Sequence, residues 1–195
     1  QQQTMRDILD ARCSFIACQD TELKQTLAML AKKPKLVITD SQVFEKVAED
    51  IPEDMFLTSF SILFARYKGN LEELVKGAIM LSQLKSGDKI LISEGCTHHR
   101  QCNDIGTVKM PAWIQKFSGV NPEYDFTSGG EFPENLSEYK LIVHCGGCML
   151  NEKEMRHRIE QAVVAGVPMV NYGVAIAQMN GILKISLEVF HILKI

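Results

Sequence analysis

The segment Lys89-Ile90-Leu91-Ile92-Ser93 is an apolar run that follows the turn sequence Ser86-Gly87-Asp88. A short apolar run next to turn residues is typical of a strand that is buried on both faces of a parallel sheet. Leu141-Ile142-Val143 and Val167-Pro168-Met169-Val170 are further runs of this kind. Together they predict the central strands of one parallel sheet.

Helical patterns separate these strands. Asn70 is expected to cap a helix, Pro111 stands in the first turn of another that runs to Phe117, and Asn151 begins a third that ends at Gly166. A further strand is expected near Tyr124-Asp125-Phe126. The alternation of strands and helices indicates an α/β fold with helices on the sheet faces.

The first part of the chain repeats this alternation on a smaller scale. Strands are predicted at residues 12–17, 35–39 and 55–58, with helices between them. We therefore expect two small parallel-sheet (Rossmann-like) domains, residues 1–65 and residues 66–195. A three-stranded sheet in so short a segment buries little surface and has open edges, which favours dimerisation, unless loops cover those edges.

Composition excludes several classes of function. The chain of 195 residues has 21 Lys plus Arg against 24 Asp plus Glu, and a formal net charge of -3. No basic run is longer than Lys32-Lys33, so nucleic acid is not an expected partner. No apolar stretch reaches the roughly 18 residues of a membrane span. We expect a cytoplasmic protein without a membrane partner, and the start at Gln1 without Met suggests a piece of a longer one.

Cysteine and histidine residues follow two of the predicted strands. Cys96 and His98 come after the first strand, and His144-Cys145-Gly146-Gly147-Cys148 comes at the end of the second. Ligands of open α/β sheets bind outside the carboxyl ends of the strands. Since cytoplasmic cysteines are kept reduced, these side chains are predicted to be metal ligands or redox thiols.

The type of chemistry depends on how many sulfurs meet. Cys145 and Cys148 form a C-x-x-C pair at a predicted helix N-terminus, which favours the thiolate and suits either metal binding or disulfide exchange. A third sulfur from Cys96 favours a metal, either an iron-sulfur cluster or a Cys/His zinc site. His98 and His144 are candidate fourth ligands, or hydrogen-bond donors beside the ligands. Inert buried thiols are the alternative.

The remaining candidates are weaker. Asp104 is an oxygen ligand candidate in the loop that follows Cys96, and Cys13 and Cys18 are interpreted as small hydrophobic residues. Other side chains of the metal-binding types are expected not to bind: His99, Cys102 and His157. No pair of acid and base residues for turnover is evident. A binding module is therefore expected rather than an enzyme.

The pattern Cys96-x-His98, followed after 45 residues by His144-Cys145-x-x-Cys148, resembles the C-x-H…H-C-x-x-C signature of the HydF family, the maturation factors of FeFe-hydrogenases. The likeness extends over nearly the whole chain, through the segments 3–10, 35–41, 57–66 and 171–177.

This resemblance implies an N-terminal GTPase domain, a dimerisation domain and a cluster-binding domain, of which the chain is similar to the last two. No G-x-x-x-x-G-K-[S/T] loop occurs in the sequence, so GTP binding is not assigned to these residues. The resemblance further implies a 4Fe-4S cluster on Cys96, Cys145 and Cys148, which anchors a di-iron precursor as cargo. The implied partners are the radical-SAM maturases HydE and HydG, apo FeFe-hydrogenase, and a second copy in a homodimer or higher oligomer.

Overall fold

The computed structural model describes residues 1–95, 104–147 and 149–190. The chain divides into two compact units. The first comprises Gln1–Phe60 with the described residues from Lys184 onward, and the second comprises Ser61–Leu183. The functional assignment of residues 1–65 and 66–195 as domains stays a prediction.

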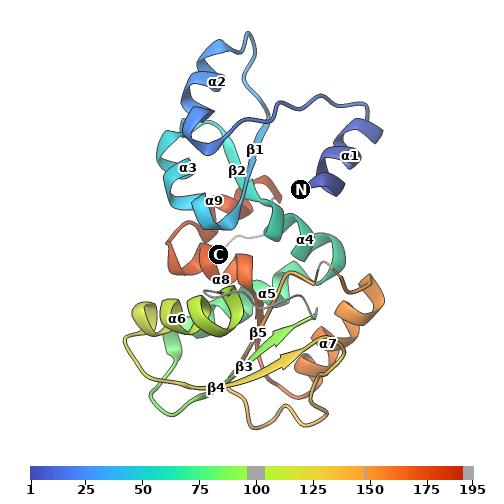
Figure 1. Cartoon of the computed structure of the whole chain (residues 1–195), viewed down its shortest axis with the longest axis vertical. Coiled ribbons are helices and arrows are strands. Elements are labelled where there is room, and N and C mark those ends of the chain that lie inside the picture. Colours follow the sequence, from blue (N-terminus) through green and yellow to red (C-terminus); the bar gives the residue numbers. More distant parts are fainter. Residues whose placement is uncertain (96–103, 148, 191–195) are drawn as a thin grey trace. The chain divides into compact units, whose positions relative to one another are not determined.

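The first unit contains a two-stranded parallel sheet. Strand β1 (Leu36–Thr39) pairs with β2 (Phe56–Ser59). The helices α2 (Leu23–Met29) and α3 (Phe44–Asp50), each preceded by a 3-10 turn, lie around this sheet (Figure 1). The C-terminal α9 (Leu183–Leu187) and η5 (Glu188–Phe190) bring Ser186 to the end of β2, where Thr58 Oγ1 donates to its carbonyl at 3.0 Å.

The strand predicted at residues 12–17 is wrong for the single chain. These residues have no regular secondary structure and all are exposed, and the preceding helix α1 (Gln2–Asp10) buries none of its residues. The large apolar side chains Phe15 and Ile16 are 38% and 62% exposed. A strand needs a neighbour for its backbone N–H and C=O groups, and this segment pairs with none of the described strands.

The second unit is built on a four-stranded parallel sheet. Its strands are β3 (Lys89–Glu94), β4 (Glu123–Ser128), β5 (Leu141–His144) and β6 (Met169–Asn171), in the order β4-β3-β5-β6. The predicted α/β class and its parallel pairing are confirmed. The central strands β3 and β5 are almost wholly buried, in agreement with their apolar sequence.

The helices of this unit cover both faces of the sheet. The chain leaves β3 through η4 (Ile105–Lys109) and α6 (Met110–Ser118) to reach β4, and it leaves β5 through α7 (Glu152–Val164) to reach β6. These two connections run in opposite directions along the sheet, so right-handed crossovers place α6 and α7 on opposite sides, as Figure 1 shows. The strand order reverses between β3 and β5. That crevice is the usual ligand site of such sheets.

Three further helices complete the unit: α4 (Phe60–Lys68), α5 (Leu71–Met80) and α8 (Tyr172–Met179). Gly77 of α5 packs directly on the backbone of β6. A Cβ at this position would collide with the Met169 carbonyl group. The helix α4 was not expected from the sequence. Among the described residues, no helix is long and apolar enough to span a membrane.

Candidate metal centre

The two segments that carry the predicted ligands start from neighbouring strand ends. Ser93 of β3 is in register with His144 of β5, and the Cys145 amide continues the pairing by donating to the Ser93 carbonyl at 2.9 Å. Gly95, the first residue after β3, donates its amide to Sγ of Cys145, the first residue after β5, at 3.0 Å. The end of β3 therefore contacts the first cysteine of the C-x-x-C segment directly.

The sulfur of Cys145 receives a second amide from its own loop. The Gly147 N–H donates to Sγ at 3.4 Å, so two backbone donors from different segments point at one half-buried sulfur. Gly147 has a φ of 62°, and a Cβ on it would lie 2.9 Å from Met155 Sδ. Only glycine fits this conformation and this space without strain.

His144 is fully buried, and both of its ring nitrogens have partners. Nδ1 lies 2.7 Å from the Cys145 carbonyl, and Nε2 lies 3.1 Å from Nη1 of Arg158. A carbonyl only accepts and a guanidinium only donates, so Nδ1 carries the proton and Nε2 accepts. Burial lowers the pKa of His144 to about 4, against the opposing effect of the bond to Cys145. The imidazole is neutral at pH 7.

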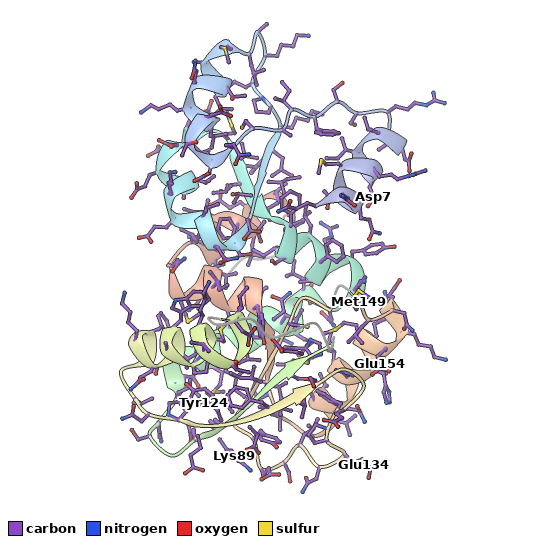
Figure 2. The ribbon with its side chains drawn as sticks, viewed as in Figure 1. Asp7, Lys89, Tyr124, Glu134, Met149 and Glu154 are labelled. Carbon is purple, nitrogen blue, oxygen red and sulfur yellow. The ribbon has the colours of Figure 1, made fainter. Side chains whose placement is uncertain are left out.

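Arg158 joins three parts of the unit in its buried position on α7. Besides His144, its guanidinium donates to Glu154 Oε1 at 2.8 Å and to the Gly129 carbonyl at 3.0 Å, and it stacks 5.0 Å from the Phe132 ring centre. Figure 2 labels Glu154 on this helix. The network fixes the end of β5 against the loop that follows β4. The ionic pair with Glu154 accounts for the burial of this charge.

A second cationic side chain, Lys68, contacts the backbone on either side of position 148. Nζ of Lys68, the last residue of α4, donates to the Gly147 carbonyl at 3.2 Å and to the Leu150 carbonyl at 2.9 Å. Sequence reasoning missed both Lys68 and Arg158. Neither residue stands in a motif, and only the folded chain brings them to the loop.

An acidic and phenolic pair lies at the end of β3. The Tyr172 hydroxyl donates to Glu94 Oε1 at 3.3 Å, and the backbone of Gly106 packs so closely that a Cβ there would collide with both groups. Burial, followed by the nearby Glu94 charge, strongly raises the pKa of Tyr172, so the phenol keeps its proton. Asp104, a candidate oxygen ligand, accepts hydrogen bonds from the Gly106 and Thr107 amides and caps η4.

Of the predicted ligands, Cys145, His144 and Asp104 are described, and the His144 ring contacts the backbone carbonyl of Cys145. The predicted ligands Cys96, Cys148 and His98 lie outside the described residues, as do His99 and Cys102. Within the described ranges, no three acidic, cysteine or histidine side chains come together as a metal site. Cys13 and Cys18, interpreted from the sequence as small hydrophobic residues, are exposed in the described chain.

The donor set at Cys145 fits an iron-sulfur group. Backbone N–H groups that donate to cysteine sulfur are among the features that set the reduction potentials of such clusters. The half-exposed sulfur follows the carboxyl end of β5, next to the end of β3, and a Cβ at the adjacent Gly146 would meet no atom within 4 Å. The ligand residues of such a group would be cysteines that follow these two strands.

Comparisons with known families identify the chain. Residues 1–69 match the model of the Hydrogen maturase F dimerization domain, and residues 72–189 match that of the Hydrogen maturase F tetramerization domain. A comparison with curated proteins finds no match. The matched domains define an oligomeric assembly module of a hydrogenase maturation factor. The chain belongs to the hydrogenase maturase F (HydF) family, and it has a role in hydrogenase maturation as a homo-oligomer.

Proposed function

We propose that this chain is a scaffold that holds a 4Fe-4S cluster on Cys96, Cys145 and Cys148 and carries a di-iron precursor to apo FeFe-hydrogenase. The observation that supports it most is the hydrogen bond from the Gly95 amide to Cys145 Sγ. It joins the residue before Cys96 to the first cysteine of the C-x-x-C pair at the switch point of the sheet.

The chain's own residues would hold and orient the group. Two amides donate to Cys145 Sγ, while Lys68 and the His144–Arg158 pair fix the backbone on either side of it. A cluster on three protein thiolates supplies one iron with an exchangeable coordination position, to which cargo can attach and from which it can leave. A fourth cysteine ligand would close that position.

The partners follow from the proposed cargo. A precursor built elsewhere must be delivered by the enzymes that make it, for which we propose the radical-SAM maturases HydE and HydG, and it must then pass to the apo-hydrogenase. GTP would act through a GTPase domain of the longer protein, since this chain has no phosphate-binding loop of the G-x-x-x-x-G-K-[S/T] type.

Anaerobic reconstitution with iron and sulfide tests the proposal. The wild-type chain is expected to bind about four iron and four sulfide per chain and to turn brown. Cys96→Ala and Cys145→Ala should each lose most of the chromophore, whereas Cys13→Ala, a matched change of an exposed cysteine in the other unit, should keep it.

Two outcomes would overturn the cluster assignment. A colourless protein that binds about one zinc per chain through the same cysteines would indicate a structural zinc site. A dithiol-disulfide activity that survives Cys96→Ala but not Cys145→Ala would indicate a thiol oxidoreductase, because exchange needs the C-x-x-C pair alone.

A further inference from the structure

The positively charged side chain of Lys68 contacts the backbone next to the C-x-x-C pair. Its ammonium donates to the carbonyls of Gly147 and Leu150, the residues that flank the sequence Cys148-Met149. Two carbonyl oxygens that accept from one cation hold Gly147 and Leu150 close to that cation. Figure 2 labels Met149, the exposed residue between these two contacts.

Several contacts fix Lys68 itself. It is the last residue of α4 and half-buried, and its Nζ lies 5.4 Å from the ring centre of Phe64, one turn earlier in the same helix. Gly147, one of its two backbone partners, is buried and donates its own amide to Cys145 Sγ. One residue thus accepts from the Lys68 ammonium and donates to the ligand sulfur.

This chain of contacts has an electrostatic consequence. A 4Fe-4S cluster on three thiolates carries a net negative charge, which increases by one unit when the cluster takes up an electron. A cation held near the ligand loop stabilises the more negative, reduced state more than the oxidised state, and so raises the reduction potential. The same cation stabilises the loop conformation in which Gly147 donates to Cys145 Sγ.

We infer that Lys68 is a positioning residue of the cluster site, which anchors Gly147 and Leu150 through their carbonyls and raises the reduction potential of the cluster. The inference rests on the proposed function. The two effects are separable, because hydrogen bonding and charge can be removed independently at this position.

Three variants of the full chain make this separation. Lys68→Met removes both the donors and the charge, Lys68→Gln keeps donors without the charge, and Lys68→Arg keeps both. Lys76→Met is the matched control, because Lys76 is an exposed lysine of the same unit that pairs with Glu73. Each protein is reconstituted anaerobically and titrated with dithionite, which supplies one electron per cluster, while electron paramagnetic resonance follows the reduced form.

The midpoint potential is expected to shift to more negative values in Lys68→Met and Lys68→Gln, and to stay near the wild-type value in Lys68→Arg and Lys76→Met. Iron release to a chelator should be roughly tenfold faster in Lys68→Met, which loses charge-assisted hydrogen bonds to the loop. If Lys68→Met retains too little cluster for a titration, the midpoint potential of Lys68→Gln shows the effect of removing the charge.

Equal potentials in wild type, Lys68→Met and Lys68→Gln would overturn the inference and leave the scaffold function intact. A wild-type chain that assembles no cluster would overturn both. A negative shift in Lys76→Met as large as that in Lys68→Met would also overturn the inference, since the effect would then belong to the net charge of the protein.

Discussion

Arg158 and His144 form a buried hydrogen bond in which Nη1 of the guanidinium donates to Nε2 of the imidazole at 3.1 Å. The bond uses the lone pair through which a neutral imidazole would bind a metal, and the other ring nitrogen donates to the Cys145 carbonyl. Of the two roles predicted for His144, this arrangement favours the hydrogen-bonding one. His144 then stabilises the backbone of the neighbouring cysteine.

Replacement of His144 should therefore weaken the fold of the second unit. His144→Ala leaves Nη1 of the buried Arg158 without its acceptor, a loss of about 1–3 kcal/mol in the free energy of unfolding. Urea denaturation of the metal-free protein measures it. His157→Ala, on the exposed side of the same helix, should change stability by less than about 0.5 kcal/mol. Equal stability of the two variants would contradict the buried network.

The two glycines of the C-x-x-C segment should differ in their tolerance of a side chain. Gly147→Ala would place Cβ 2.9 Å from Met155 Sδ at a φ of 62°, so we expect a loss of about 1–3 kcal/mol and weaker cluster retention. Gly146→Ala meets no atom within 4 Å and should be nearly neutral. Thermal unfolding and iron content check both variants. A Gly146→Ala variant that is the more damaged of the two would contradict this geometry.

Removal of the buried hydroxyls of Thr58 and Ser93 should have different effects on stability. Within the described part of the chain, Ser93 Oγ has no hydrogen-bond partner, whereas Thr58 Oγ1 donates to the Ser186 carbonyl at 3.0 Å. Thr58→Val should cost about 1–3 kcal/mol, because the carbonyl loses its donor, and Ser93→Ala should be close to neutral. Denaturant unfolding compares them. A greater loss for Ser93→Ala would show that its hydroxyl is satisfied.

The stability of the second unit should depend on pH through Asp125, which lies on the edge strand β4. Hydrogen bonds from Lys89 and then Tyr139 lower the pKa of this carboxyl below its usual 3.8. Its contribution to stability is thus present above about pH 4 and is lost as the pH falls through the lower folded-state value. Asp125→Asn should reduce stability at pH 7 and flatten the acid limb of the stability curve. Exposed Glu123, on the same strand, supplies the control Glu123→Gln.

The apolar strand runs made most of the second unit predictable. Ile90-Leu91-Ile92 and Leu141-Ile142-Val143 are wholly buried, and they pair in the parallel sense that their composition indicates. The caps were predictable for a local reason: the Asn70 and Asn151 side chains accept from amides three residues later. Both signals lie within a few residues of the element that they specify.

What sequence reasoning missed depends on contacts between distant segments. Arg158 reads as a solvated charge on α7, yet it is fully buried by partners that lie 14 and 29 residues away. Residues 12–17 have the composition of a strand, but a strand requires a neighbour that the described chain does not supply. No motif marks Lys68 in the sequence, because its loop partners come about 80 residues later.

The bond between the Gly95 amide and Cys145 Sγ spans 50 residues of sequence. During synthesis, the ribosome must release β3, β4 and β5 before that bond can form, because β4 lies between the other two strands in the chain. No peptide cut from either segment alone can form this contact. If the proposed cluster binds at Cys145, its loading is a late event in the life of the polypeptide, after the sheet has been completed.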